Sequence, residues 1–218
     1  MNKILKTFAF VLSICAVFTF SQVAYAQWPS DLDGGGSGRQ QIQKSSPSSN
    51  KPVYTQQQRT NTSKKAVQKG MIPKSIFGIN FQFPASWIVN DEAAQNPILF
   101  LSFLPLADDN SFRDNMLICG ETLPQEMNSQ EYFDLSLKQL SNSISNFKLL
   151  AKGKVTIDGY EGRVIKFTQN ANGPTIQQEQ LYIAVGNRGY VITISSIPSR
   201  FEKSRKDAYK LINTITFD

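Results

Sequence analysis

The sequence contains no histidine. This absence removes the usual general base, the usual partner of a serine or cysteine nucleophile, and the commonest protein ligand of zinc. Most hydrolase mechanisms are left without a base, and only lysine-based or paired-carboxylate mechanisms survive. We therefore predict no catalytic, cofactor-binding or metal-binding residue, and the sequence alone names no binding residue.

The sequence also lacks an apolar run long enough to cross a membrane, which takes roughly 20 residues. Its main apolar run, residues 8–20 (FAFVLSICAVFTF), covers 13 positions and follows Lys3 and Lys6. Ala24-Tyr25-Ala26 then supplies the small residues of a signal peptidase site. We predict a cleavable signal peptide over residues 1–26, and a mature protein that is periplasmic or secreted and has no transmembrane span.

Cysteine is nearly as scarce, with two residues in the whole chain. Cys15 lies in the predicted signal peptide, so cleavage near Ala26 leaves Cys119 alone and excludes an intramolecular disulfide in the mature chain. Cys119 stands among apolar neighbours in "NMLICGE", which favours a buried and unreactive thiol.

Residues 27–75 show no apolar periodicity and are rich in Gln, Ser, Gly and Lys. Such a segment cannot bury enough surface to offset the entropy lost on ordering, which predicts a disordered linker. It holds eight lysines or arginines against two aspartates, whereas residues 76–218 hold thirteen basic and fifteen acidic residues. The basic linker can contact an anionic envelope surface loosely or act as a solvated tether, and its charge leaves both readings open.

Residues 76–218 are predicted to form one domain, which opens with strands. The stretch 77–83 alternates apolar with small or polar residues, which is typical of a half-buried strand. Pro84 has no backbone donor and ends this strand, and Trp87 is expected to fold back onto the core. Residues 97–106 and 115–123 are more continuously apolar, which favours central strands.

Two helices are predicted from capping residues and apolar stripes. Asn128 and Glu131 form an imperfect capping box at the first helix, and Ser199 and Glu202 match a capping box at the second. The first stripe consists of Phe133, Leu137, Leu140, Ile144 and Phe147. The second consists of Phe201, Ala208, Leu211, Ile212 and Ile215.

Between the helices, residues 147–169 and 175–197 each predict a β-hairpin. Their turns are placed at Asp158-Gly159 and at Asn187-Arg188-Gly189. The four strands are expected to form an antiparallel meander. The order of elements predicts an α+β fold, an antiparallel sheet of six to seven strands with the helices packed against it.

Five carboxylates are candidates for acid–base work, namely Glu121, Glu126, Asp158, Glu161 and Glu179. A glycan-cleaving enzyme needs two acids about 5 to 9.5 Å apart across a cleft. An enzyme that acts on cell-wall or glycan substrate through such a pair is therefore the alternative to a non-enzymatic binding protein.

Two further clusters are weaker candidates. Asp108, Asp109 and Asp114 offer oxygen ligands for Ca²⁺, but the loop lacks the glycine and the distal glutamate of an EF-hand, which favours a solvated turn. Three basic residues on adjacent predicted strands could contact a nucleic acid, namely Lys154, Arg163 and Lys166. Acidic residues stand beside them and the domain is slightly acidic, so nucleic acid is not a predicted partner.

Three stretches carry a family resemblance: "FGINFQFPASW" (77–87), "IDGYEGRVIKF" (157–167) and "LYIAVGNRGYVITISSIPSRFEKSRKDAYKLINTITF" (181–217). Together they resemble the PsbP family and the related bacterial envelope proteins of the DcrB type. The resemblance covers residues 76–218 and implies a Mog-type α-β-α sandwich with a short closing strand after the last helix.

The resemblance also implies a function. What the resemblance implies is an exported, non-enzymatic domain that binds or stabilises a larger assembly, so we expect a protein partner or an envelope complex. PsbP proteins support photosystem II, and a photosystem II accessory role is a second alternative. Metal sites proposed in that family use histidine, which this chain lacks, so they are not carried over.

Overall fold

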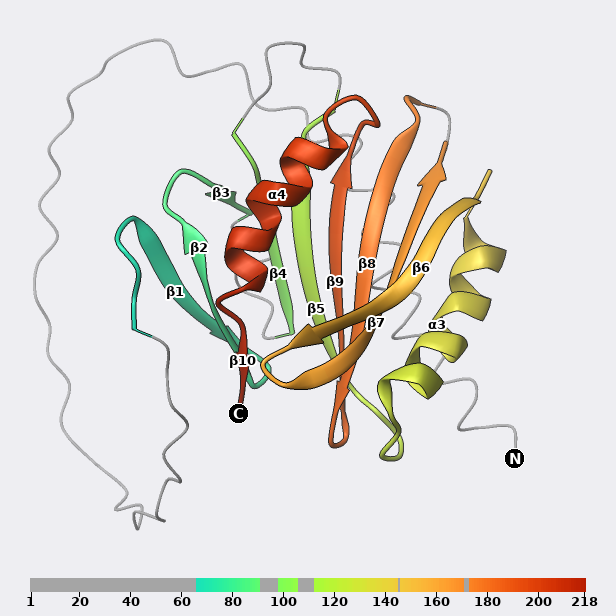
Figure 1. Ribbon diagram of the computed structural model, residues 1–218, viewed down its shortest axis with the longest axis horizontal. Helices are drawn as coiled ribbons and strands as arrows, with labels where there is room; N and C mark the ends of the chain where they lie inside the picture. The colour runs from blue at the N-terminus through green and yellow to red at the C-terminus, as the bar shows by residue number, and fades with distance from the viewer. Residues whose placement is uncertain (1–65, 91–97, 106–111, 145, 171–172) are drawn as a thin grey trace, which may run out of the picture. The chain divides into compact units, whose positions relative to one another are not determined.

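The computed structural model describes residues 66–90, 98–105, 112–144, 146–170 and 173–218. The described residues form ten strands and two helices, drawn in Figure 1. The predicted signal peptide and most of the predicted linker lie outside these ranges. No helix within them is long and apolar enough to cross a membrane.

Seven of the strands form one antiparallel sheet in the order β3-β4-β5-β9-β8-β7-β6. Their bounds are β3 Ile88–Val89, β4 Leu99–Phe103, β5 Asn115–Thr122, β6 Lys148–Ile157, β7 Tyr160–Gln169, β8 Ile176–Val185 and β9 Arg188–Ser196. The predicted meander is confirmed over β6 to β9. Its last strand pairs with β5, which lies well inside the sheet, as its apolar sequence predicted.

The other three strands form a separate sheet in the order β1-β2-β10: β1 Met71–Ile76, β2 Ile79–Pro84 and β10 Thr216–Phe217. The predicted domain boundary at residue 76 is therefore too late, because β1 already begins at Met71. The predicted strand 77–83 is also corrected at its start. Phe77 and Gly78 have φ of 45° and 78°, so they form the two-residue turn between β1 and β2.

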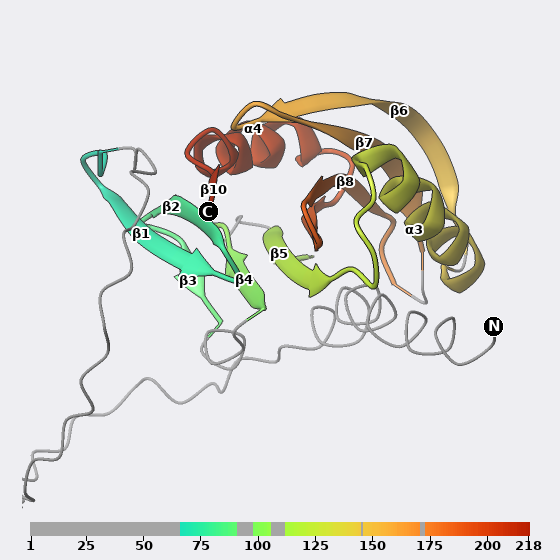
Figure 2. The same ribbon diagram turned by 90° about the horizontal axis from the view of Figure 1, so that it is seen from below.

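The two helices lie on opposite faces of the seven-stranded sheet, with β8 between them in Figure 2. The helix α3 (Ser129–Ser143) packs on Tyr182 and Val191, whereas α4 (Phe201–Ile212) packs on the alternate residues, such as Leu181 and Ile183. Successive side chains of a strand point to opposite faces, so the sheet supports two separate cores. The core under α4 also includes β2 and β10.

The helix caps agree with prediction at one helix only. Asn128 and Glu131 form the reciprocal capping box of α3. The box predicted from Ser199 and Glu202 is wrong, because α4 begins at Phe201 after Arg200 and has no side-chain cap. Glu202 instead accepts a hydrogen bond from Lys166 at 3.0 Å, so its carboxylate serves to attach α4 to β7.

The hairpin turns are set by residues that tolerate positive φ. Asp158 and Gly159 have φ of 50° and 82° and form the predicted β6–β7 turn. The β8–β9 turn consists of Gly186 and Asn187, one position before the prediction, with Gly186 at a φ of 58°. Arg188 therefore belongs to β9, and its guanidinium lies 5.9 Å from the centre of the Phe77 ring.

Trp87 and Cys119 are both buried, as predicted. The Trp87 amide donates to the Pro84 carbonyl at 3.0 Å, so the chain turns tightly at the end of β2 and places the indole in the α4 core. Cys119 is disulfide-bonded in this structure, which differs from the predicted unpaired thiol.

Replacing Trp87 with alanine tests this packing. The indole is 6% exposed, so Trp87→Ala is expected to lower the free energy of unfolding by about 3–5 kcal/mol through lost transfer energy and a cavity. Chemical denaturation measures the change. The neighbouring Ile88 is 41% exposed, and Ile88→Ala should cost well under half as much. Equal losses for the two variants would contradict the core position of Trp87.

Candidate functional site

The two buried glutamates of the sheet point to opposite faces. Glu121 on β5 contacts Tyr132 of α3, whereas Glu179 on β8 contacts Arg205 and Tyr209 of α4. The sheet itself separates the two carboxylates, so they do not face each other across a cleft.

Glu121 lies under α3 and is 6% exposed. Its Oε1 accepts a hydrogen bond from the Tyr132 hydroxyl at 2.6 Å. Burial raises the pKa of Glu121, and the hydrogen bond from Tyr132 opposes this only in part. Burial and the nearby carboxylate together raise the pKa of Tyr132 as well, so Tyr132 stays a donor at neutral pH.

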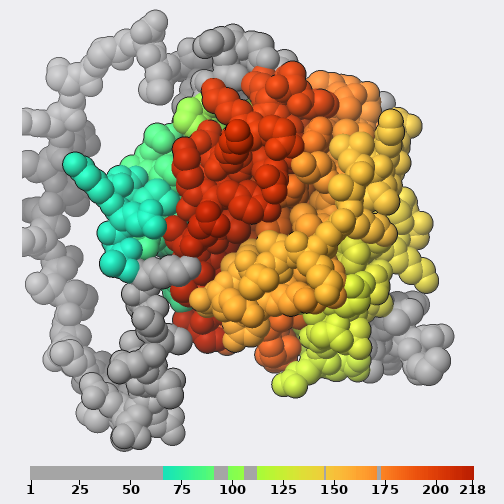
Figure 3. All heavy atoms as spheres, in the orientation of Figure 1, coloured from blue at the N-terminus to red at the C-terminus, as the bar shows by residue number. Residues whose placement is uncertain are grey.

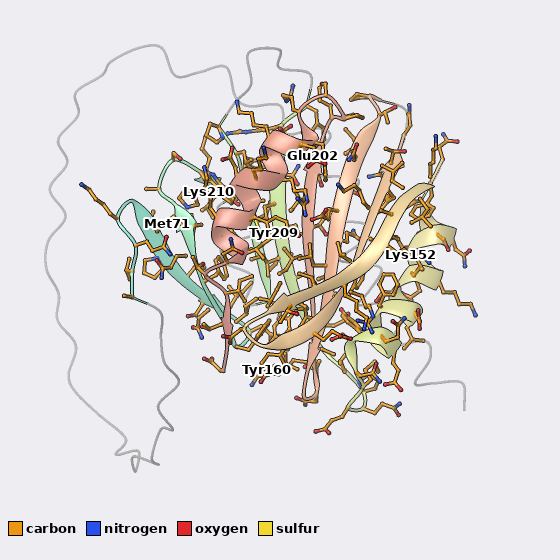
Figure 4. All side chains as sticks on the ribbon, viewed as in Figure 1. Met71, Lys152, Tyr160, Glu202, Tyr209 and Lys210 are labelled. Atoms are coloured by element: carbon orange, nitrogen blue, oxygen red, sulfur yellow. The ribbon has the colours of Figure 1, made fainter. Side chains whose placement is uncertain are left out.

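Glu179 lies under α4 and is 2% exposed. It accepts hydrogen bonds from Arg205 Nε at 2.8 Å and from the Tyr209 hydroxyl at 2.8 Å, and Lys166 Nζ lies 3.8 Å from it. Burial raises the pKa of Tyr209 to about 12, with Glu179 adding to the effect. Figure 4 labels Tyr209 and Glu202 on α4. The carboxylate is fully engaged in holding α4 to the sheet.

The other three candidate acids are not brought into a pair with either glutamate. Glu161 shares a face with Glu121, but β9 and β8 lie between their strands, which puts their backbones about 14 Å apart at roughly 4.8 Å per strand. Asp158 accepts the Phe217 amide at 2.9 Å, and Glu126 is exposed in the loop before α3. Strand order and sheet face therefore separate Glu121, Glu161 and Glu179 from one another, and each bonds to a different set of partners.

Asp114 is the one member of the predicted cation cluster within the described residues; Asp108 and Asp109 lie outside them. It is buried, pairs with Arg200 at 2.9 Å and accepts a hydrogen bond from Ser204. The prediction of a solvated turn is therefore wrong for Asp114, which anchors the start of α4. Across the described ranges, no three acidic, cysteine or histidine side chains gather as a metal site.

The three basic residues considered for nucleic acid are separated and paired. Lys154 and Arg163 lie 3.2 Å and 2.6 Å from Glu161 on the α3 side, whereas Lys166 faces α4 and pairs with Glu202. The hydrogen bond from Arg163, and to a lesser extent the one from Lys154, lowers the pKa of Glu161. These residues do not form a continuous basic surface on one face.

An aromatic cluster, which the sequence did not reveal, connects four distant segments. Its rings are those of Phe77, Tyr190, Phe217 and Tyr160, with successive centroids 6.2, 5.1 and 5.4 Å apart. The Tyr190 hydroxyl donates to the Phe77 carbonyl at 2.9 Å, so the β1–β2 turn is fixed to β9. A Cβ on Gly120 would lie 2.5 Å from the Phe77 ring, so this position requires glycine.

Tyr160 connects the aromatic cluster to the surface. It is 42% exposed and begins β7 at the tip of the β6–β7 hairpin. Leu149 and Leu150 on β6 are 45% and 44% exposed. Figure 3 shows β6, in yellow to orange, uncovered on the face that it draws, and Figure 4 labels Lys152 and Tyr160 on this hairpin.

We call this area the β6 surface and define it by Lys148, Leu149, Leu150, Lys152, Lys154 and Tyr160. It combines exposed apolar and cationic side chains. The sequence signal was "KLLAK", in which two adjacent leucines stand between lysines on a strand.

Replacing Glu121 with glutamine tests the buried carboxylate. Because folding raises the pKa of Glu121 above 4.5, the protonated form contributes stability that is present below pH 4.5 and lost as pH rises. Glutamine is neutral at every pH and still accepts from Tyr132. Glu121→Gln should match the wild type near pH 4 and exceed its stability at pH 7, as measured by urea unfolding.

The matched control is Glu126→Gln, which changes an exposed residue of the adjacent loop and should leave the stability unchanged at both pH values. A Glu121→Gln variant that is less stable than the wild type by the same amount at pH 4 and pH 7 would contradict the burial argument.

Comparisons with known proteins agree with this architecture. Cyanobacterial PsbP (CyanoP) of Synechocystis superposes with a TM-score of 0.50 at 10% identity, covering 72% of this chain and 98% of that one. LpqN of Mycobacterium tuberculosis, described as involved in cell envelope biogenesis, has a TM-score of 0.50 at 13% identity, covering 67% and 89%. The Ran-binding protein Mog1p of Saccharomyces cerevisiae has a TM-score of 0.49 at 11% identity, covering 67% and 96%.

At identities this low, the superpositions on CyanoP and LpqN show a shared fold and no more, and the predicted resemblance to PsbP-like proteins is confirmed at that level. No curated protein sequence matches the chain significantly. The sequence model of the DcrB family matches residues 101–214, which is more than half of the 218 residues. The chain therefore belongs to the DcrB family.

Proposed function

We propose that this protein is an exported, non-enzymatic accessory protein of the cell envelope, and that it acts by binding a protein partner through the β6 surface. The observation that carries the proposal is the exposure of Leu149 and Leu150 beside three lysines on one strand. Exposed apolar side chains that gather in one place mark interaction sites, whereas single ones are ordinary.

The state of the buried carboxylates supports the non-enzymatic part. Asp114, Glu121 and Glu179 each have a partner from another element, and these contacts hold helices to the sheet. Together with the absence of histidine from the whole sequence, this leaves the named acids in structural roles.

Two features support the envelope part. The N-terminal sequence has the three regions of a signal peptide. LpqN, whose fold this chain shares, is described as involved in cell envelope biogenesis.

Export is tested by expressing the whole chain with its own N-terminus in a bacterium. We expect a processed product in the periplasmic or secreted fraction whose first residue is Gln27, because Ala24 and Ala26 fit the peptidase. Replacing both alanines with leucine should block processing and serves as the control. An unprocessed wild-type chain confined to the cytoplasm would contradict export.

Partner binding is tested by crosslinking the tagged mature protein in its native envelope. A Leu149→Ser, Leu150→Ser double variant should lose partner capture at least tenfold, since exposed apolar anchors dominate such interfaces. Leu135→Ser on α3 is the matched control, because Leu135 is equally exposed at 45%.

Both variants should keep the wild-type melting temperature, because they change exposed side chains. Capture that survives the double variant, or that is lost equally in Leu135→Ser, would overturn the assignment to the β6 surface.

A further inference from the structure

The strand β6 ends the seven-stranded sheet, and among the strands in the described ranges it pairs with β7 alone. Its side chains are exposed over residues 148–154. An end strand presents a row of backbone N–H and C=O groups on which a further strand can form. The β6 surface therefore offers backbone hydrogen bonds in addition to side-chain contacts.

The β6–β7 turn determines which backbone groups of β6 point outward. Ile157 and Tyr160 flank a two-residue turn, so they form a hydrogen-bonded pair of the antiparallel ladder. Such pairs alternate with non-hydrogen-bonded pairs, whose backbone N–H and C=O groups point away from the partner strand. Along β6, the residues with outward-pointing backbone groups are therefore Thr156, Lys154 and Lys152. The register shift between Leu149 and Ala151 then interrupts the ladder, so the regular outer edge runs over residues 151–156.

We propose that β6 binds an extended, acidic segment of the protein partner, which adds to the sheet as an outer strand. The inference rests on the proposed function and names the chemistry of the partner. β6 carries three lysines and no acidic residue. Directly opposed opposite charges on neighbouring strands attract, so aspartate or glutamate side chains suit the positions beside Lys152 and Lys154.

The two faces of β6 also define the pattern of the segment. Lys152 lies 5.8 Å above the Phe133 ring of α3, so Lys152 and Lys154 point to the α3 side. Ala151, Gly153 and Val155 point to the other side and are small or apolar. The segment that fits therefore alternates acidic residues on the α3 side with apolar residues on the α4 side.

Two other readings of this edge are less consistent with its composition. A second copy paired through β6 would place lysines opposite lysines, which is repulsive. Lysines alone can protect an edge from aggregation, but protection does not account for two adjacent exposed leucines. An acidic segment matches the charge of the lysines on the regular edge, and the two leucines add exposed apolar surface next to the end of that edge.

The test uses the mature protein and a ten-residue peptide with blocked ends that alternates glutamate and valine. The control peptide has lysine in place of glutamate. Titration is followed by NMR hydrogen exchange. At saturation with the acidic peptide, the amides of Lys152, Lys154 and Thr156 should exchange at least tenfold more slowly, while Val155, already bonded to β7, should not change.

A pair of variants separates backbone pairing from charge. Lys152→Gln removes the charge, whereas Lys152→Pro removes the charge and the outward N–H donor without removing a bond to β7. The proline variant should bind the acidic peptide at least tenfold more weakly than the glutamine variant. Should the proline variant not fold, the exchange rates of the wild type decide the question.

The proposal is overturned if the acidic peptide does not bind, if the lysine peptide binds equally well, or if binding leaves the three outward amides unprotected. If, in the absence of peptide, the protection of these amides increases with protein concentration, then β6 pairs with a second copy of the chain instead. Partner capture that is lost in the double leucine variant but kept in Lys152→Pro would overturn strand addition and leave the proposed function intact.

Discussion

The fold depends on burying both faces of one antiparallel sheet under separate helices. Because side chains alternate along each strand, α3 and α4 receive different residues of the same strands, such as Tyr182 and Leu181. Polar side chains on covered strands must then find partners inside the domain, since burying an unpaired charge is costly. Glu121 and Glu179 meet this requirement through a tyrosine of α3 and an arginine and tyrosine of α4.

The same requirement decides where function can reside. The buried carboxylates of Glu121 and Glu179 are hydrogen-bonded to side chains of the two helices, so they occupy structural positions between helix and sheet. The strand β6 is different, because it ends the sheet and keeps most of its side chains in solvent. A scaffold that uses its buried charges internally and leaves one strand exposed is suited to the binding role that we propose.

Local signals in the sequence predicted the elements well and their arrangement less well. Alternation, proline and capping residues located the strand before Trp87, the hairpin at Asp158-Gly159 and the start of α3. The second sheet was not predicted, because pairing between β2 and the C-terminal β10 joins residues far apart in the chain. The separation of the candidate carboxylates and the edge position of β6 likewise depend on strand order, which periodicity does not encode. Phe77 was placed in a strand because its apolar character fits one, whereas Tyr190 and Gly120 hold it in a turn.

The central claim, that the partner contacts the β6 surface, is tested most directly by site-specific photocrosslinking in the native envelope. A photoreactive amino acid is placed at Leu149 in one protein and at the equally exposed Leu135 in another. The account predicts a strong crosslink from position 149 to one defined protein and little from position 135. Equal crosslinking from both positions, or none from position 149, would contradict it.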